Sequence, residues 1–401
     1  MSFKVEKAKS YFKPQAVKTI ALLLLTYVVL CLIVIVIPYE YRDSDSSAYS
    51  SLAQKLARLP IVQWCAPEWG GHAGRIGFFQ EHPPGALWVT ALFIRLGVPG
   101  PPAALCVNFL YIFLSLYFIY LLASYFGGPF LGWATVFAYT FSPIFLQYLI
   151  RANLEHPFNL AVIAGIYGVV RCEESWKYKI LFVLSLIFAF FVKGTGAFIL
   201  IILSFLCWVI YLRSKRTLRF IIVGILITLI VMFLFEIWYR QVTDGIYFWQ
   251  NYINQQSDQI VESGSNPLRK IYNFIWYLGR VIWFPAPWVF FIFYGVYKWR
   301  KEIMLLFENK YFMLSMVSAV FIILWFSLFD RKADRYIFPA YSFLVFAGAW
   351  ALLRLKPKIT EWLQKRKKLL PVYLSSVLII FTILRIFFHN HYYRFIRFWP
   401  E

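Results

Sequence analysis

The sequence predicts an all-α polytopic membrane protein with about 11 transmembrane helices. Hydrophobic residues make up 61% of the 401 residues and charged residues only 15%, which excludes an ordinary water-soluble globular protein. Long apolar runs recur along the chain, and the first, from Ile20 to Ile37, carries no charge over about the length that crosses a hydrocarbon core of roughly 30 Å. Short basic segments separate many of these runs, as expected at one face of a membrane.

We place the transmembrane helices by the length of each apolar run and its polar flanks. The expected spans are 19–38, 104–125, 130–150, 157–171, 179–193, 196–212, 220–239, 272–297, 311–329, 337–353 and 370–388. The first run lacks a small-residue cleavage site, so we interpret it as a retained span and not as a signal peptide. The segment from Gly85 to Val98 is apolar but short and contains Arg95, which favours a helix lying in the membrane interface.

The distribution of charge supports this scheme and gives it an orientation. With a cytoplasmic N-terminus, the inner segments hold most of the 40 basic residues and few of the 19 acidic ones, as the positive-inside rule requires. An extra crossing between Gly85 and Val98 would turn the basic clusters at 213–219 and 354–368 outward, so we reject it. The net charge of +21 is therefore attributed to topology and to anionic membrane lipids, with no nucleic-acid partner.

The outer face is the elaborate one in this scheme. The first outer loop covers 39–103, whereas the inner connections are short and contain no Gly-rich phosphate-binding motif. Chemistry driven by a cytosolic nucleotide is therefore not expected, and an activated substrate is expected from the membrane or the outer compartment. The five cysteines support neither a disulfide framework nor a cysteine-based metal site.

Acidic residues lie where three outer segments leave the membrane. Asp43-Ser44-Asp45 precedes an amphipathic helix expected over 45–59, and by itself it is better explained as a helix cap. Glu81-His82-Pro83-Pro84 closes the same loop, and the triplet Glu155-His156-Pro157 repeats its pattern at the start of the fourth span. Prolines at helix starts also explain both of these motifs, but together the three segments predict one site on one face.

Cations are expected close to this site. The Lys193-Gly194-Thr195-Gly196 turn joins two short spans and should lie below the outer surface, where a lysine is costly unless it is paired or faces a wet cavity. Snorkelling to the interface is the structural alternative. Arg280 in the eighth span, and Lys332 and Arg335 before the tenth, are further cations of this kind.

The order of these motifs resembles a known family. An acidic motif follows the first span, His82-Pro83-Pro84 ends the first loop, Glu155 follows the third span, Lys193-Gly194 follows the fifth, and Arg335-Tyr336-x-x-Pro339 opens a late span. This order is similar to that of the protein-mannosyltransferase and aminoarabinose lipid A transferase branch of the C-type membrane glycosyltransferases. The resemblance covers about residues 18–355, so we expect a glycosyltransferase membrane domain over 1–355, followed by a basic linker, a last span and a short tail over 356–401.

The resemblance implies transfer of a sugar from a polyprenyl-phosphate carrier at the outer face of the cytoplasmic membrane, usually with inversion. It implies three groups of site residues: catalytic Asp45, Asp43 and Glu155; donor phosphate-binding Lys193, His82, Arg335, Lys332 and Arg280; and substrate- or acceptor-binding Glu81, His156 and Tyr336. The spacing to Tyr49 makes Asp45 the better match to the essential acid, whereas Glu155 stands where the family usually has Asp. The family's extra soluble domains have no counterpart here, so the acceptor, whether lipid, glycan or protein, is not implied.

The residue types agree with this chemistry, and several alternatives stay open. A carboxylate such as Asp45 can serve as the base for an attacking hydroxyl, and cations stabilise a departing phosphate. No cofactor is assigned, although carboxylates and histidines leave a divalent metal open. An O-antigen ligase or polymerase would not predict an acidic motif directly after the first span. A lipid-linked sugar flippase or transporter should show internal repeats, which we do not find.

Overall fold

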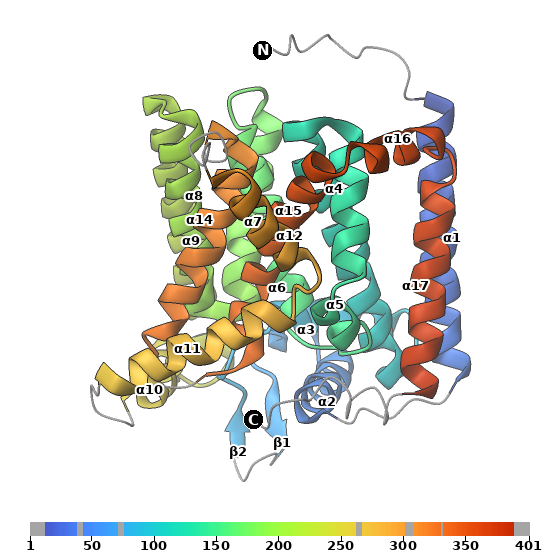
Figure 1. Cartoon of the computed structure of the whole chain (residues 1–401). Helices are drawn as coiled ribbons and strands as arrows, with labels where there is room; N and C mark the ends of the chain where they lie inside the picture. Colours follow the sequence, from blue (N-terminus) through green and yellow to red (C-terminus); the bar gives the residue numbers. More distant parts are fainter. Residues whose placement is uncertain are drawn as a thin grey trace.

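Apolar helices run side by side through most of the protein and confirm the predicted all-α membrane class (Figure 1). The computed structural model describes residues 13–37, 43–70, 76–261, 267–300, 308–329 and 332–388. The helices and strands are α1 (Lys13–Val36), α2 (Ser44–Arg58), η1 (Ile61–Gln63), β1 (Glu68–Gly70), β2 (Ile76–Phe78), α3 (Gly85–Arg95), α4 (Gly100–Thr140), α5 (Pro143–Tyr148), α6 (Glu155–Val170), α7 (Trp176–Lys193), η3 (Gly194–Ala197), α8 (Phe198–Cys207), η4 (Trp208–Leu212), α9 (Lys215–Val242), α10 (Phe248–Val261), α11 (Pro267–Trp283), α12 (Trp288–Lys298), α14 (Lys310–Ser327), η6 (Asp334–Ile337), α15 (Phe338–Leu355), α16 (Pro357–Lys365) and α17 (Leu370–Phe387).

Helix α4 is two helices joined by a sharp reversal. The backbone leaves helical geometry at Gly127 and Gly128, and Gly128 adopts a φ of 79° that few residues other than glycine accept. The rings of Tyr120 and Trp133 lie 5.3 Å apart, whereas 13 residues of straight helix would separate them by about 20 Å. The two halves therefore pack against each other, as the separate spans predicted over 104–125 and 130–150 require.

The lengths of the helices only partly test the predicted spans. Among the described residues, seven stretches are long and apolar enough to cross a membrane, and a bent pair makes up to eight, so a count of eleven stays a prediction. The span expected over 130–150 is shorter than predicted, because the helix ends at Thr140 and the short α5 follows it. The span expected over 272–297 is broken, since α11 and α12 meet at 97° around Pro285 and Pro287, which cannot donate helical hydrogen bonds.

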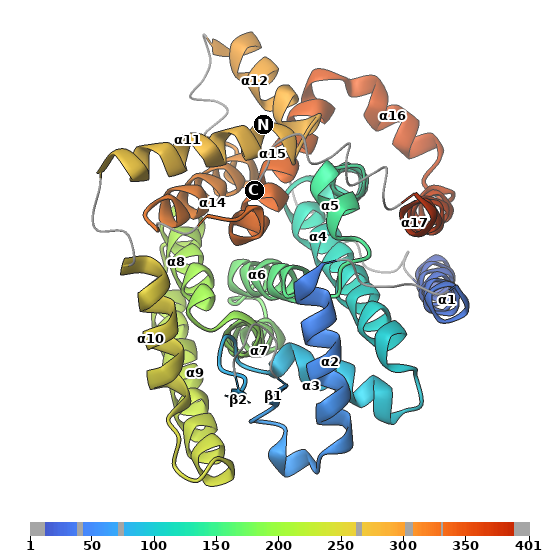
Figure 2. The ribbon, with the colours of Figure 1, turned by 90° about the horizontal axis from the view of Figure 1, so that it is seen from below.

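One end of the bundle, called here the α2 end, carries the loop structures (Figure 2). Helices α2, α3, α10 and α11 and the antiparallel β1–β2 hairpin lie there, at the bottom of Figure 1. The amphipathic helix predicted over 45–59 is α2, which buries Leu52, Ala53 and Leu56, and the short apolar helix predicted after Pro84 is α3. Which side of a membrane this end faces stays a prediction.

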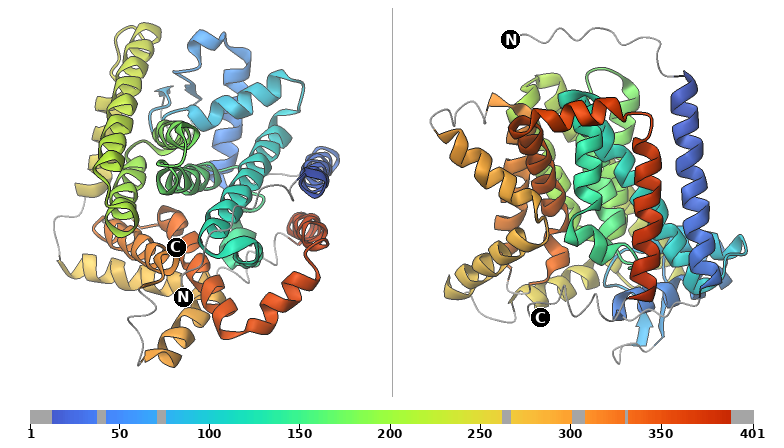
Figure 3. Two further views of the ribbon diagram at one scale, coloured as in Figure 1. Left: turned by 90° about the horizontal axis from the view of Figure 1, so that it is seen from above. Right: turned by 45° about the vertical axis from the view of Figure 1, so that its right-hand side comes forward.

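Helices α1 and α17 stand together at the edge of the bundle (Figure 3). Helix α16 connects α15 to α17 at the opposite end, where it carries Lys358 and Lys365 beside the half-exposed Trp362. This pattern is that of a helix lying in a membrane interface.

Helix α6 forms the centre of the bundle and fixes the position of the site. All of its residues are buried, because α4, α7, α8 and α15 surround it, and a helix that is apolar all round belongs in such a place. Its first residue is Glu155, so the packing of the core places the Glu155 carboxylate at the α2 end.

Candidate active site

The start of α2 presents two acids with different contacts. Asp43 is the N-cap, since its Oδ1 accepts a hydrogen bond of 2.8 Å from the Ser46 amide. Asp45 lies in the first turn and forms an ion pair with Arg335, which comes from η6 far along the chain. Both side chains of this pair are 30% exposed. The capping interpretation therefore applies to Asp43, and Asp45 is the acid that contacts a predicted cation.

A second ion pair lies deeper. The Oε1 atom of Glu155 is 3.7 Å from the Nζ atom of Lys193, and the two side chains are only 2% and 10% exposed. The Nζ atom also donates to the Arg335 carbonyl oxygen at 3.5 Å and lies over the Phe158 ring. The Oε2 atom of Glu155 is buried and has no hydrogen-bond partner among the described residues. Lys193 is thus a buried, paired cation, and does not snorkel to the surface.

Tyr252 of α10 holds the turn between α7 and α8 that carries Lys193. Gly194 has a φ of 52°, and a Cβ atom there would lie 2.3 Å from the Tyr252 hydroxyl oxygen. That hydroxyl accepts from the Thr195 amide at 2.9 Å and donates to the Lys193 carbonyl at 3.2 Å. The sequence did not identify Tyr252, because more than fifty residues separate it from the turn that it contacts.

Close helix packing brings the Glu81-His82 segment to the same turn. Gly85 lies so near α7 that a Cβ atom would be 2.5 Å from the Phe191 Cβ and 2.9 Å from the Phe191 carbonyl oxygen. The Glu81 carbonyl accepts a hydrogen bond of 3.5 Å from Gln256 of α10. The chain just after His82 therefore packs on the last turn of α7, which ends at Lys193.

Tyr49 joins the α2 segment to the buried acids. It lies one turn after Asp45, and its ring meets the Phe79 ring edge-on at 6.2 Å. Burial raises the pKa of its hydroxyl well above the ordinary value, and the carboxylates of Glu155 and Glu81 add to this effect. The hydroxyl therefore stays protonated and can donate a hydrogen bond to a substrate oxygen.

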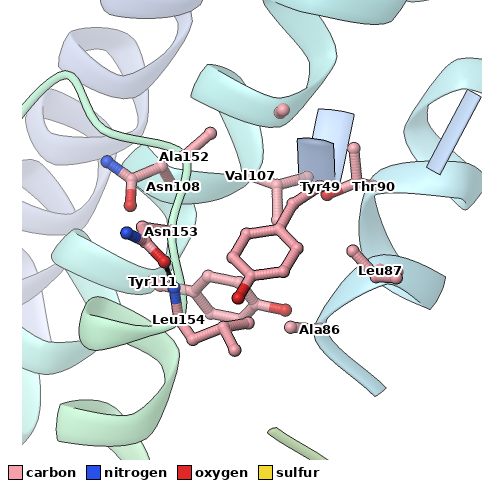
Figure 4. Close-up of a pocket in the computed structure, with 11 residues that line it drawn as sticks. Tyr49, Ala86, Leu87, Thr90, Val107, Asn108, Tyr111, Ala152, Asn153 and Leu154 are labelled. Carbon is pink, nitrogen blue, oxygen red and sulfur yellow. Dashed lines mark hydrogen bonds between the residues drawn. The ribbon is translucent and has the colours of Figure 1, made fainter. Parts of the chain in front are cut away.

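Beside Tyr49, a narrow pocket opens between α2, α3, α4 and the segment before α6 (Figure 4). Tyr49 and Tyr111 both line it. The Tyr111 hydroxyl and the Asn108 Oδ1 atom are buried without a hydrogen-bond partner among the described residues. The lining residues are Tyr49, Ala86, Leu87, Thr90, Ala104, Val107, Asn108, Tyr111, Ala152, Asn153 and Leu154, so the pocket is uncharged but offers hydrogen bonds.

The other predicted cations lie against α11. The Nε atom of Arg280 is 2.9 Å from the Asp334 carboxylate, and its guanidinium lies 4.0 Å over the Trp276 ring. Lys332 lies 3.7 Å over the Tyr272 ring. These contacts are with Asp334 and with rings of α11, whereas Lys193 and Arg335 pair with the predicted catalytic acids.

His156 and Tyr336, two of the predicted substrate-binding residues, both pack against aromatic rings. His156 is buried between Phe145 and Phe338, and its Nε2 atom lies 3.2 Å from the Tyr148 carbonyl oxygen. Tyr336 stacks on Phe326 at 5.7 Å between ring centroids. The packing of His156 supports a structural role, and a role in substrate binding stays a prediction for both residues.

A further cation acts on the buried acid Glu155, whereas metal ligands do not cluster in the described part of the chain. Arg151, which the sequence did not identify, lies 5.0 Å over the Tyr148 ring just before α6 and interacts electrostatically with Glu155. No group of three or more His, Cys, Asp or Glu side chains able to hold a metal ion gathers within the described ranges. We therefore derive no step through a metal.

Known proteins share both sequence and fold with the chain. The family model of the dolichyl-phosphate-mannose-protein mannosyltransferases matches residues 81–238. No curated protein matches the sequence. The structure of ArnT from Cupriavidus metallidurans bound to undecaprenyl phosphate has a TM-score of 0.65 at 17% identity, over 89% of this chain and 62% of ArnT. The apo form of ArnT has a TM-score of 0.59 at 16% identity, over 87% of this chain and 61% of ArnT.

An archaeal protein extends this comparison. The oligosaccharyltransferase AglB from Archaeoglobus fulgidus, in complex with an inhibitory peptide and a dolichol-phosphate, has a TM-score of 0.51 at 13% identity, over 92% of this chain and 56% of AglB. The chain thus spans less than two thirds of the length of ArnT and AglB. These matches confirm the resemblance drawn from the order of the motifs: the chain has the fold of the C-type membrane glycosyltransferases and, over residues 81–238, the sequence pattern of their protein-mannosyltransferase branch.

Proposed function

We propose that the protein transfers a sugar from a polyprenyl-phosphate-linked donor to an acceptor at the α2 end, with Asp45 as the general base. The observation that carries this proposal is the meeting of two acid–cation pairs from four separate elements. Asp45 of α2 pairs with Arg335 of η6, while Glu155 of α6 pairs with Lys193 of α7, and the Lys193 Nζ atom reaches the Arg335 carbonyl. A base and two cations within one small region are what this reaction needs.

A lipid-linked phosphate suits the position of the cations. Lys193 is buried at the end of a membrane helix, next to the half-exposed Arg335. A phosphate whose tail lies in the bilayer would therefore reach both cations from the membrane side, and guanidinium and ammonium groups are the usual protein partners of phosphate. The structurally similar ArnT and AglB were solved with undecaprenyl phosphate and a dolichol-phosphate, which supports this donor class.

The chemical step divides between these residues. An acceptor hydroxyl attacks the anomeric carbon of the donor sugar, while Asp45 takes the hydroxyl proton. The bond between that carbon and the phosphate oxygen breaks, and the polyprenyl phosphate leaves with both bonding electrons. Lys193 and Arg335 stabilise its developing negative charge. Attack from the face opposite the leaving phosphate inverts the anomeric configuration.

The Asp45–Arg335 ion pair implies that the donor binds before Asp45 takes the proton. While Arg335 binds Asp45, the carboxylate oxygens are engaged by a guanidinium and are poor proton acceptors. The donor phosphate competes for the same guanidinium, so donor binding frees Asp45. Glu155 neutralises Lys193 in the absence of a donor, which reduces the cost of burying the ammonium group.

The last part of the proposal is the side of the membrane on which the site acts. The basic segments predicted on the inner side and the elaborate loops at the α2 end fit a bacterial cytoplasmic membrane with a cytoplasmic N-terminus. The site would then act on the periplasmic side, where a lipid, a glycan or a protein can serve as acceptor.

The proposal is tested with purified protein, radiolabelled polyprenyl-phosphate sugars and a membrane lipid extract. Wild-type protein should give labelled product, and Asp45→Asn should abolish it because the amide cannot accept the proton. The matched control is Asp244→Asn, which changes an exposed acid after α9 and should keep wild-type activity. Full activity of Asp45→Asn would remove Asp45 from the mechanism.

A further inference from the structure

Tyr252 of α10 has no place in the mechanism above, yet it is buried against the turn that carries Lys193. It is 1% exposed. Its hydroxyl accepts from the Thr195 amide at 2.9 Å, lies 3.0 Å from the Thr195 Oγ1 atom, and donates to the Lys193 carbonyl at 3.2 Å. A phenol offers one donor and two acceptor lone pairs, so these contacts use all of its capacity.

These contacts satisfy groups that the end of α7 leaves open. The last carbonyls of a helix and the first amides of the next have no helical partners. Here the chain reverses within Lys193-Gly194-Thr195, and one hydroxyl ties the carbonyl before the glycine to the amide after it. Gly194 has a positive φ and no room for a Cβ atom beside Tyr252, so only glycine lets the hydroxyl approach this turn so closely.

The start of α10, which carries Tyr252, is fixed against α9. The Glu236 carboxylate of α9 accepts from the Phe248 and Trp249 amides at 3.1 and 3.0 Å, which fixes the first turn of α10 against α9. The ring of Tyr252 stacks on Phe248 with centroids 6.0 Å apart. One turn further along α10, Gln256 donates to the Glu81 carbonyl, so α10 contacts both predicted donor-binding segments.

We propose that Tyr252 is a positioning residue that sets the backbone of Lys193, and through it the ammonium group, for the donor phosphate. The inference rests on the proposed function and extends it to a residue that does not touch the reacting atoms. The hydroxyl acts through Lys193: without it the turn gains freedom, and the ammonium group spends less time where the phosphate binds.

Tyr252→Phe tests this, because it removes the hydroxyl and keeps the ring. The KM for the polyprenyl-phosphate sugar should rise roughly five- to tenfold, the scale of lost hydrogen bonds to a buried group. Because Lys193 also stabilises the leaving phosphate in the proposed mechanism, kcat should fall as well. Tyr247→Phe is the matched control, since Tyr247 is 48% exposed and packs on Arg240. It should leave both constants unchanged.

A double-mutant cycle separates positioning from general destabilisation. The affinity for undecaprenyl phosphate is measured for the wild type, Tyr252→Phe, Lys193→Ala and the double variant. If Tyr252 acts through Lys193, its substitution weakens binding in the wild type and has no further effect on the residual binding of Lys193→Ala. Equal weakening in both backgrounds, or no weakening in either, overturns the role of Tyr252.

Two further results complete the test. Thr195→Val removes another partner of the hydroxyl and should weaken binding in the same direction, so it replaces Tyr252→Phe in the cycle if that variant does not fold. Wild-type protein that binds no undecaprenyl phosphate contradicts the proposed function and the positioning role together. Wild-type binding with an unchanged Tyr252→Phe variant overturns the positioning role alone.

Discussion

The two acid–cation pairs of the site differ chiefly in their exposure to solvent. Asp45 and Arg335 are each 30% exposed and join segments that lead into helices at the α2 end. Glu155 and Lys193 are 2% and 10% exposed and lie where α6 and α7 meet in the core. The first pair can exchange its partners for substrate groups, because water can solvate either charge during the exchange. The second pair cannot separate without leaving a charge buried.

This difference assigns them different tasks. A half-exposed pair contributes little to stability but is suited to a step in which a ligand replaces one partner. A buried pair fixes geometry, since each charge requires the other to stay in place. Removing charges one at a time therefore distinguishes a pair that exchanges partners during the proposed reaction from one that holds Lys193 in place for the donor phosphate.

Breaking the buried pair should have the largest effect. Glu155→Ala leaves Lys193 without its counterion, so we expect the free energy of unfolding to fall by about 3–5 kcal/mol. Thermal unfolding of the detergent-solubilised protein should show this as a clear decrease in melting temperature. The control is Glu155→Leu combined with Lys193→Met, which removes both charges and should recover most of the lost stability without activity. A single variant that melts like the wild type would show that the pair does not stabilise the fold.

Breaking the half-exposed pair should affect the rate more than stability. In the proposed mechanism, Arg335→Ala removes a cation from the leaving phosphate, so we expect kcat to fall about 100-fold. Its melting temperature should change little, since the pair contributes at most about 1 kcal/mol. Arg335→Lys should recover part of the rate, because lysine keeps the charge but lacks the planar fork. A rate that falls only in proportion to lost stability would contradict the division of tasks.

The smallest effect is expected at Asp43. Asp43→Ala removes the N-cap of α2, so we expect the free energy of unfolding to fall by about 1 kcal/mol. Asp43→Ser keeps a capping oxygen and should recover both stability and activity. Activity of Asp43→Ser near the wild-type level would assign Asp43 to the helix and leave Asp45 as the chemical acid. A strong loss of rate in a stable Asp43→Ser protein would restore its predicted catalytic role.

Much of the fold follows from local sequence. Apolar runs and basic flanks predicted the membrane class, and the polar and apolar pattern after Asp45 predicted α2. The single span predicted over 272–297 lacks the bend between α11 and α12, because the apolar run continues on both sides of Pro285 and Pro287. The short α5 was missed because its residues are as apolar as those of a crossing helix.

The site was predicted as a set of residues, but not as a set of contacts. Motif order singled out Asp45, Glu155, Lys193 and Arg335, and the structure brings them together in pairs. Sequence spacing carries no information on which acid meets which cation, since these contacts join helices far apart in the chain. Tyr252 has no motif of its own, so only the packing of α10 beside the Lys193 turn reveals it.

Under the proposed function, the bend between α11 and α12 bears on which lipid carriers can donate the sugar. Helix α11 lies along the α2 end with Leu268, Ile271 and Ile275 exposed on its surface, whereas α12 runs along the bundle. In the proposed orientation, a helix of this kind would lie at the level of the lipid headgroups and hold the neighbouring site at the same height. A carrier phosphate reaches that height whatever the length of the tail beneath it. We therefore expect the protein to discriminate among carriers by headgroup and sugar, and to tolerate polyprenyl tails of different lengths.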